Sequence, residues 1–412
     1  MILQILKQLK KISDTKESVT RLGFSELEAE AHAAVGATFK RRTRVNVLKD
    51  QVGNTFIVNG SGKGPFVVMG SHLDTVPNGG WLDGALGVAG AAAAMHRILK
   101  KDRNAAIAVA IWVDEEGYRF GNGMFGSRSF AGRVTEQEML LRDREGITLI
   151  DLLVEKGLQK KPRRSRETGE LVIKFQNKQV IEIAAYGEVH IEQGRRLLDA
   201  GKKIGIVTDV AGIRRWRLES IGELNHAGTT PMRERRDALV PIAGMVGRLP
   251  QLVRGLEDAV ITAGAMSVEP GVANVVPNRA WAIIEHRAPT ERDQDEIARR
   301  LKELVATTGP RAPGVSLEMT PISWVRPTPL SEEVTATLEA IAEEVEVESL
   351  RMVSMAGHDA MSVARVAPAG LFFIPSLKGI SHRPDEDSKP DDIKLAAEIL
   401  YRWAVAALER VL

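Results

Sequence analysis

The sequence predicts an α/β protein whose main domain has a mostly parallel sheet with flanking helices and is interrupted by an inserted α+β domain. Two short, continuously apolar runs at residues 65–70 and 105–113 are typical of strands buried on both faces. The alanine-rich segment 86–101 between them has a helical pattern, which predicts a strand–helix–strand unit. The chain of 412 residues also exceeds the roughly 250–300 residues that one hydrophobic core usually serves.

The predicted helices of the main domain have recognisable ends. Ser25 and Glu28 have the spacing of a capping box ahead of residues 27–39, which predicts a surface helix there. Segment 86–101 ends in basic residues, which favour the C-terminal end of a helix dipole.

The pattern changes near residue 211 and changes back near residue 326. Residues 216–219 alternate between apolar and polar, and a predicted helix follows at 235–256. Two strand-like runs and a second helix at 291–305 come next, and residues 311–319 could form the last strand. The order β-α-β-β-α-β predicts a split βαβ layer with its helices on one face.

The α/β pattern resumes after the insertion. A helix, a strand and a helix are predicted at residues 331–345, 371–374 and 391–412. We therefore expect a discontinuous main domain, residues 1–210 and 327–412, and an inserted domain, residues 211–326.

Composition excludes several classes of protein. The 56 basic and 54 acidic side chains give a net charge of +2, which provides no general attraction to nucleic acid or anionic lipid. No apolar run reaches the length of about 18 residues that a membrane span needs. The basic segment 160–166 lacks aromatic residues and is expected to be a solvated loop. We see no secretion signal at the N-terminus and expect a cytoplasmic protein.

Polar residues follow both buried strands. His72 and Asp74 come directly after the first strand, and Glu115 and Glu116 follow the second. Asp83 stands between glycines just before the predicted helix at 86–101. Because ligands bind outside the carboxyl ends of the strands in open α/β sheets, these residues are expected to meet at one crevice.

Further candidate ligands come from two later segments that contain His190 and His382. The chain has no cysteine, so any metal ion must be held by histidine and carboxylate. These donors suit two divalent ions, such as zinc, manganese, cobalt or nickel, which a carboxylate could bridge. One glutamate of the adjacent pair could bind metal while the other accepts a proton from water. Asp74 could hold the second nitrogen of His72.

The eight histidines fall into different sequence contexts. Four lie at strand ends or in glycine-flanked or loop segments, namely His72, His190, His226 and His382. Two lie within predicted helices, where packing or surface roles are expected, namely His32 and His96. His286 is expected to be structural, and His358 is expected to support the site without binding metal directly.

Six ordered motifs together resemble the amidase/hydantoinase/carbamoylase branch of the M20 metallopeptidase-like family. They are GSHLDTVPNGG at 70–80, EEGYRF at 115–120, HIEQG at 190–194, NHAGTTPM at 225–232, NVVP at 274–277 and GISH at 379–382. The resemblance implies a catalytic main domain with two divalent ions per subunit, and an inserted lid domain through which the chain forms a homodimer. It implies that His72 and His190 bind one ion, that Glu116 and His382 bind the other, that Asp83 bridges them, and that Glu115 is the general base.

The resemblance also implies a type of substrate. Ordinary M20 peptidases have a carboxylate where this chain has His190, and this exchange, with Gln193 nearby as a substrate contact, is typical of the branch that acts on ureido compounds. His226 would polarise the scissile carbonyl or stabilise its oxyanion. Asn274 and Arg287 would hold the substrate carboxylate, and in relatives these groups often come from the neighbouring subunit.

One departure from the family pattern concerns substrate identity. Relatives commonly have an aspartate two positions before the arginine that binds the substrate carboxylate, and this chain has Glu285 there. The substitution could move Arg287 and change which acid fits.

The resemblance implies a metal-dependent hydrolase that acts on a small ureido acid. It would convert an N-carbamoyl L-amino acid into the amino acid, ammonia and carbon dioxide. Allantoate amidohydrolase, β-ureidopropionase, and an aminoacylase or dipeptidase are the alternatives among enzymes. A non-catalytic binding protein on the same scaffold is the alternative outside them, and no nucleic-acid or membrane partner is expected.

Overall fold

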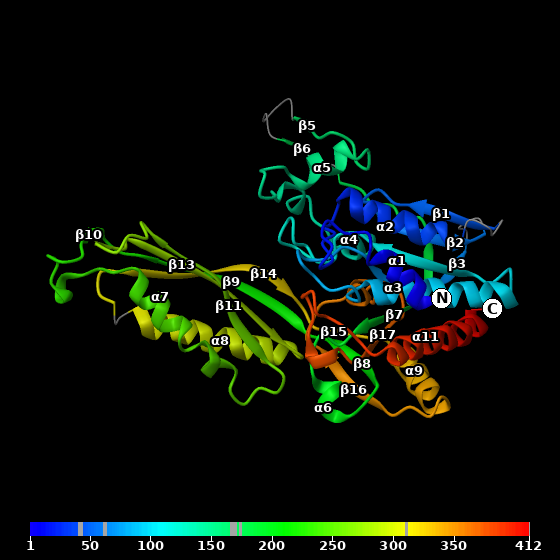
Figure 1. Cartoon of the computed structure of the whole chain (residues 1–412). Helices are drawn as coiled ribbons and strands as arrows, with labels where there is room; N and C mark the ends of the chain where they lie inside the picture. The colour runs from blue at the N-terminus through cyan, green and yellow to red at the C-terminus, as the bar shows by residue number, and fades with distance from the viewer. Residues whose placement is uncertain (40–43, 61–63, 165–170, 173–174, 310–311, 412) are drawn as a thin grey trace. The chain divides into compact units, whose positions relative to one another are not determined.

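The computed structural model describes residues 1–39, 44–60, 64–164, 171–172, 175–309 and 312–411. The chain divides into unit 1, Met1–Thr208 with Pro329–Leu412, and unit 2, Asp209–Thr328. Unit 1 is therefore discontinuous in sequence, and unit 2 is inserted into it. Figure 1 shows the elements of both units in chain order.

The large sheet has nine strands in the described part of the chain. They are β1 (Val45–Lys49), β2 (Thr55–Asn59), β3 (Pro65–His72), β4 (Ile107–Trp112), β7 (Glu182–Ile191), β8 (Ile204–Val210), β15 (Thr328–Pro329), β16 (Ser349–Ser354) and β17 (Ala369–Ile374). The main path is β1-β2-β4-β3-β7-β17-β8-β15, and β16 pairs with β8. The central strands β4, β3, β7 and β17 run parallel, as predicted.

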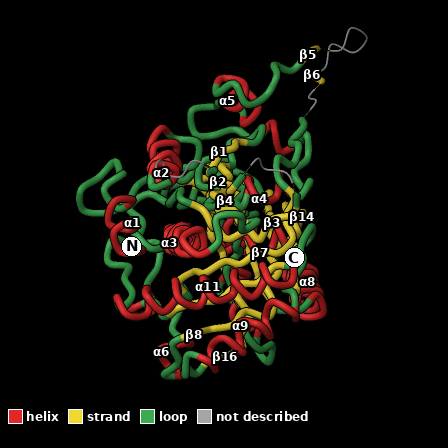
Figure 2. The backbone as a smooth tube through the Cα atoms, turned by 90° about the vertical axis from the view of Figure 1, so that its right-hand side faces the viewer, coloured by secondary structure: helices red, strands yellow, loops and turns green. Residues whose placement is uncertain are grey.

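Helices cover this sheet. Those of unit 1 are α1 (Ile2–Leu9), α2 (Glu26–Ala37), α3 (Ala85–Lys101), α4 (Phe125–Phe130), α5 (Leu149–Glu155), α6 (Arg196–Ala200), α9 (Glu332–Glu344), α10 (Asp359–Val363) and α11 (Pro390–Val411), with short 3-10 turns at Glu138–Leu140 and Leu377–Gly379. Side chains of α1, α3, α9 and α11 share one buried hydrophobic cluster with the central strands. Helices α3 and α11 pack against each other beside the sheet (Figure 2).

The predicted elements that flank the site are confirmed. Helix α2 begins as the capping box requires, because the Ser25 hydroxyl accepts a hydrogen bond from the Glu28 amide at 3.2 Å. All six residues of β4 are buried, and β3 is buried from Phe66 onward, as expected for strands covered on both faces. Helix α3 connects them and follows the predicted segment closely.

The parallel pairing brings the carboxyl ends of the central strands to one edge of the sheet. Strand β3 pairs with β4 so that His72 lies opposite Trp112 at the last registered position. Strand β7 pairs with both β3 and β17, and His190 lies opposite Phe373. The segments that follow these strands therefore begin at the same edge, which is where the candidate ligands lie.

Unit 2 has a four-stranded antiparallel sheet in the order β11-β13-β9-β14. Its elements are β9 (Gly212–Ile221), β10 (Asn225–His226), α7 (Leu239–Val246), β11 (Val260–Glu269), β12 (Val275–Val276), β13 (Arg279–Ala288), α8 (Glu291–Thr308) and β14 (Ser316–Val325), with 3-10 turns at Met232–Glu234 and Leu249–Val253. Side chains of α7 and α8 form a buried cluster with one face of β9 and β13. This is the predicted split βαβ layer.

Two predicted elements of unit 2 were wrong in extent. The helix predicted at 235–256 is only Leu239–Val246, followed by the 3-10 turn Leu249–Val253. Pro250 lies at the start of that turn and lacks the amide that a continued α-helix would need. The closing strand predicted at 311–319 begins later, at Ser316, and extends to Val325; residue 311 lies outside the described residues.

The basic segment 160–166, predicted as a loop, contains a short strand. Arg163–Arg164 form the short strand β5, which pairs antiparallel with β6 (Leu171–Val172). Residues 165–166 lie outside the described residues. Of the helices that the structure describes, none combines the length and the apolar character that crossing a bilayer requires.

Candidate metal centre

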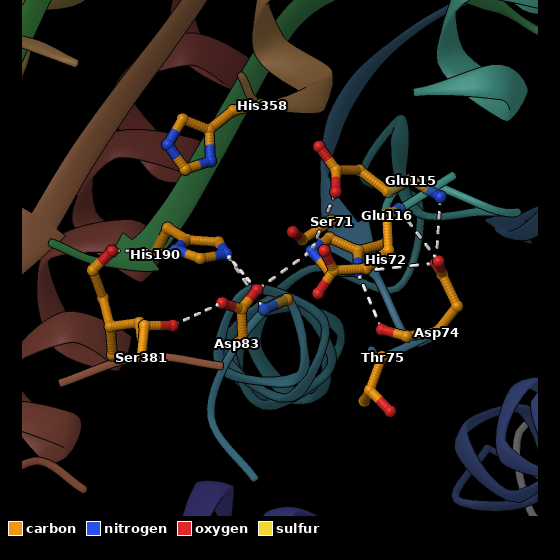
Figure 3. Close-up of polar contacts among 12 residues, drawn as sticks. Ser71, His72, Asp74, Thr75, Asp83, Glu115, Glu116, His190, His358 and Ser381 are labelled. Atoms are coloured by element: carbon orange, nitrogen blue, oxygen red, sulfur yellow. Dashed lines mark hydrogen bonds and ion pairs between the residues drawn. The ribbon is translucent and has the colours of Figure 1, made fainter. Parts of the chain in front are cut away.

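Five side chains predicted as ligands come together at the carboxyl edge of the sheet. Figure 3 shows His72, Asp83, Glu116 and His190 among them. Each comes from a different segment, and they are His72 at the end of β3, Asp83 before α3, Glu116 after β4, His190 on β7 and His382 after β17. Their donor atoms form two groups, and within each group all donor atoms lie within 4.8 Å of one another. The groups are His72–Asp83–His190 and Asp83–Glu116–His382.

Asp83 belongs to both groups because its two carboxylate oxygens face different partners. Oδ1 lies 3.3 Å from Nε2 of His72 and 3.1 Å from Nε2 of His190. Oδ2 lies 3.3 Å from Nε2 of His382. A carboxylate with one oxygen toward each donor group is suited to bridge two cations.

The two buried histidines both present Nε2 to the centre. Nδ1 of His72 donates to the backbone oxygen of Asp74 at 3.0 Å, and Nδ1 of His190 donates to the backbone oxygen of Ile191 at 2.8 Å. These bonds fix the ring orientations and select the tautomer in which Nε2 is unprotonated. In His190 this nitrogen accepts a hydrogen bond from the Gly84 backbone amide at 3.0 Å. Both rings are therefore arranged as metal-ligating imidazoles usually are.

The carboxylate of Asp74 positions the two adjacent glutamates. Its oxygens accept hydrogen bonds from the backbone amides of Glu115 and Glu116, both at 3.0 Å, whereas Oδ1 lies 3.5 Å from Nδ1 of His72. The sequence predicts that the Asp74 side chain holds the ring of His72. The shorter contact to Nδ1 of His72 comes instead from the backbone oxygen of Asp74.

The side chains of the two glutamates reach different ends of the centre. Oε1 of Glu116 lies 3.3 Å from Nε2 of His382, and Oε2 of Glu115 lies 3.7 Å from Nε2 of His72 (Figure 3 shows the Glu115 and Glu116 side chains). Adjacent residues can therefore have separate tasks.

The dense packing of acids and histidines shifts their titration. Burial, and then the charge of Asp83, raise the pKa of Glu116 to about 7. The hydrogen bond to Asp83 raises the pKa of His382 to about 9. Burial raises the pKa of Glu115 well above its usual value. Burial also acts to raise the pKa of Asp83, but the charge of His190 and the histidine hydrogen bonds outweigh it, so this pKa lies well below its usual value.

The backbone at the start of α3 allows the close approach of these groups. Gly84 has φ of +63°, and a Cβ atom there would lie 2.5 Å from Nε2 of His72. Only glycine accommodates both the left-handed conformation and the neighbouring ring. The glycines that flank Asp83 in sequence were the signal for this close approach.

Gln193 contacts the centre directly. Its Nε2 donates to Oδ2 of Asp83 at 2.7 Å. Its Oε1 is buried and has no hydrogen-bond partner among the described residues. A buried acceptor without a partner is costly, so this oxygen is available to a ligand with an N–H group.

The remaining predicted site residues lie in unit 2, and they do not form one cluster there. His226 pairs with Val275 across β10 and β12, and the Ala227 amide donates to the backbone oxygen of Asn274 at 3.0 Å. Arg279, at the start of β13, pairs with Ile221, the last residue of β9 before β10. Arg287 lies near the opposite end of β13. Eight residues of extended strand span about 26 Å. His226 and Asn274 are therefore neighbours, and Arg287 is remote from them within unit 2.

Arg287 is held by Glu285, the residue that departs from the family pattern. Nε and Nη2 of Arg287 lie 2.9 and 2.8 Å from Oε1 of Glu285, while Nε of Arg215 lies 2.7 Å from Oε2. One carboxylate thus lies between two guanidinium groups.

The histidines assigned packing roles have them. Nδ1 of His32 lies 2.9 Å from the hydroxyl of Thr55, and the ring of His96 stacks on Phe39 with centroids 4.0 Å apart. His286 is fully buried on β13, and burial lowers its pKa to about 4.

His358 lies beside the centre. Its ring centroid is 4.6 Å from that of His190, and its Nε2 lies 3.1 Å from the hydroxyl of Ser354. Neither donor group that the described residues form includes it.

Comparison with known proteins agrees with this geometry. The model of peptidase family M20/M25/M40 matches residues 68–406. The chain is 33% identical to the N-carbamoyl-L-amino acid amidohydrolase of Geobacillus stearothermophilus, over 94% of this chain and 93% of that protein. This chain belongs to peptidase family M20/M25/M40.

Other members of the M20 family share its length and fold. The chain is 32% identical to the allantoate amidohydrolase of Bacillus subtilis, over 94% of this chain and 93% of that protein. The crystal structure of an amidase of the hydantoinase/carbamoylase family from Burkholderia vietnamiensis has a TM-score of 0.83 at 30% identity, and covers 98% of this chain and 96% of that one. The mixed α/β architecture with a mainly parallel central sheet is thus that of the M20 family.

Two residues beside the centre of this M20 chain were not predicted from the sequence. The Ser381 hydroxyl lies 2.8 Å from both Oδ2 of Asp83 and Oε2 of Glu386 (Figure 3 shows Ser381 beside Asp83). Glu386 lies in the loop after β17, where a glutamate by itself gives no signal of function. The donor set as a whole, three imidazoles and buried carboxylates, fits the binding of divalent metal.

We predict that the metal-depleted protein binds a divalent cation more tightly as pH rises between about 6 and 9. Protons on Glu116 and His382, whose pKa values are about 7 and about 9, must leave before these groups can bind a cation. Each displaced proton contributes about a tenfold gain in apparent affinity per pH unit below its pKa. Calorimetric titration with Mn²⁺ at several pH values measures this gain; an affinity independent of pH would contradict it.

Proposed function

We propose that this M20 family member hydrolyses the ureido C–N bond of an N-carbamoyl L-amino acid, giving the amino acid, ammonia and carbon dioxide. The observation that carries the proposal is the position of Asp83, with one carboxylate oxygen toward each of two donor groups. Relatives at 33% identity over nearly the full chain are named for this activity. The presence of His190, with Gln193 beside it, supports a ureido substrate.

In this proposal two divalent ions, zinc, manganese, cobalt or nickel, occupy the centre. His72 and His190 would hold one ion, Glu116 and His382 the other, and Asp83 would contact both, which the two donor groups support. Such a pair of ions supplies an acidified water molecule and an electrophile for the carbonyl oxygen. The protein residues would then move the proton and hold the substrate.

Glu115 is the proposed general base. It is adjacent to the donor groups without belonging to either, and its Oε2 lies 3.7 Å from Nε2 of His72. A carboxylate whose pKa is raised by burial is a stronger base than one in water. Glu115 takes a proton from the attacking water and delivers it to the leaving nitrogen.

Gln193 and His226 are proposed to contact the reacting group. The buried Oε1 of Gln193 can accept a hydrogen bond from a ureido N–H. Nδ1 of His226 accepts from the amides of Gly228 and Thr229, at 3.0 and 3.2 Å, so the proton of the neutral ring is on Nε2. That N–H can donate to the oxyanion that forms as the carbonyl is attacked.

The separation of sites within unit 2 supports a homodimer in which unit 2 acts as lid and dimerisation domain. A small ureido acid cannot reach both His226 and Arg287, because Arg287 lies eight strand residues, about 26 Å, from Arg279 at the end of β13 nearer to β10. If His226 and Asn274 contact the ureido acid from one subunit, Arg287 must bind the carboxylate from the other. The planar guanidinium of Arg287 is a group that can hold a carboxylate through two parallel hydrogen bonds.

A panel of substrates tests the proposal. Metal-loaded enzyme is expected to release ammonia from N-carbamoyl L-amino acids and to act more slowly on allantoate, on N-carbamoyl-β-alanine and on N-acetyl amino acids. Allantoate hydrolysis is the second candidate, because a relative at 32% identity is named for it. Cleavage of acylated amino acids or dipeptides without cleavage of ureido compounds would contradict the proposal.

We predict that Glu115→Gln lowers kcat by about 10²–10⁴-fold, the usual contribution of a general acid–base group. Because Glu115 belongs to neither donor group, the variant protein should bind as much divalent metal as the wild type does. Steady-state ammonia release and elemental analysis of the same preparation measure both quantities. A near-normal kcat would refute the assigned role.

We predict that His226→Ala lowers kcat by about 10²–10³-fold, as loss of an oxyanion donor does. His226 is exposed in unit 2, so the thermal stability and the metal content should not change. Loss of metal from this variant would show that its assignment as a substrate contact is wrong.

A further inference from the structure

One buried carboxylate contacts two of the three segments that carry the ligands of the second donor group, Asp83–Glu116–His382. Glu386 is 1% exposed. Its Oε1 accepts hydrogen bonds from the backbone amides of Leu82 and Asp83, at 2.9 and 3.0 Å. Its Oε2 accepts from the Ser381 hydroxyl at 2.8 Å and from the backbone amide of His382 at 3.3 Å. The loops that it joins are separated by about three hundred residues of sequence.

The contact extends to the side chain of Asp83. The Ser381 hydroxyl lies 2.8 Å from Oδ2 of Asp83 as well as 2.8 Å from Oε2 of Glu386. Oδ2 is the oxygen that faces His382. Glu386 therefore fixes the backbone of two ligands, and it shares the single hydroxyl proton of Ser381 with the carboxylate that joins both donor groups.

Gly80 leaves space for the carboxylate of Glu386. A Cβ atom on Gly80 would lie 2.0 Å from Cδ of Glu386 and within 2.4 Å of both of its oxygens. Any larger residue at this position would displace the carboxylate. Gly80 and Glu386 thus form a matched pair, one providing the space that the other fills.

The burial of Glu386 beside Asp83 does not stabilise the fold when no cation is bound. Burying a carboxylate beside a second carboxylate, Asp83, is unfavourable because like charges repel and water is excluded. Divalent cations bound to Asp83 would offset that repulsion. Glu386 contacts Asp83 and His382, two members of the second donor group, but only Asp83 in the first, whose histidines lie on strands of the sheet.

We propose that Glu386 is a positioning residue that sets the relation of Asp83 to His382 and thereby determines affinity for the cation held by Asp83, Glu116 and His382. This inference rests on the proposed two-cation centre. Partners that hold metal ligands in place usually contribute about 10–100-fold in metal affinity. We expect the effect to fall mainly on this cation, because the cation of the first donor group keeps two ligands, His72 and His190, that lie on strands and do not contact Glu386.

The test is a titration of metal-depleted full-length protein with Mn²⁺ and with Co²⁺, followed by calorimetry and by the visible spectrum of bound Co²⁺. The wild type is expected to bind two cations. Glu386→Ala and Gly80→Ala should keep one binding event and weaken the other about 10–100-fold. Glu386→Gln should show a smaller loss, because its amide has one oxygen and can serve only one of the two loops as acceptor.

Asp50→Ala is the matched control for the loss of a buried carboxylate. Asp50 is 3% exposed, and its Oδ1 accepts from the amides of Val52, Gly53 and Asn54 at 3.1, 3.0 and 2.9 Å. It lies outside both donor groups. Its removal should lower the melting temperature and leave both metal affinities unchanged.

Two results would overturn the inference. One is that Glu386→Ala, or Glu386→Gln if the alanine variant does not fold, binds both cations as the wild type does. The other is that both affinities fall equally in the Glu386 and Asp50 variants, which would indicate a general loss of stability. Failure of the wild type to bind two cations would instead refute the two-cation centre itself, so the two failures are distinguishable.

Discussion

The arrangement of the site depends on the carboxylate of Asp83. Its oxygens lie 3.1–3.3 Å from three imidazole nitrogens that come from three distant segments. Around it, acidic side chains are buried at a density that would be unfavourable without positive charge. The histidines supply part of this charge, as the low pKa of Asp83 indicates. Divalent cations would supply the rest, and this requirement connects the fold to the chemistry.

The fold provides this arrangement with rigid and adjustable parts. Parallel strands β3 and β7 fix His72 and His190, whose rings are further oriented by backbone carbonyls. Loops provide the other ligands, and buried carboxylates hold these loops: Asp74 binds the amides of the glutamate pair, and Glu386 binds those of Asp83 and His382. A centre built in this way needs a second layer of acids as much as it needs its direct ligands.

Much of the centre could be predicted from the sequence because strand ends are visible in it. Continuous apolar runs identify parallel strands, and the polar residues that follow them must meet at one edge. Loop geometry is not visible in the same way. His382 and Gln193 have φ values of +58° and +61°, and no residue pattern indicates that a non-glycine residue adopts this conformation. Glu386 was missed because its partners are backbone amides, which every residue has.

The inserted unit was predictable in topology and less so in detail. The β-α-β-β-α-β order follows from the alternation of apolar residues in strands and their helical period in helices. The first helix is shorter than predicted, because the 3-10 turn Leu249–Val253, which contains Pro250, follows it. The separation of Arg287 from His226 could not be read from motif order, because strand direction decides it. That Glu285 joins both Arg215 and Arg287 likewise depends on the cross-strand register.

Anomalous X-ray diffraction from crystals grown with Mn²⁺ or Zn²⁺ tests the account most directly. The account predicts two anomalous peaks per subunit on either side of the Asp83 carboxylate, one beside His72 and His190 and the other beside Glu116 and His382. A single peak, or peaks that Asp83 does not contact, would contradict it.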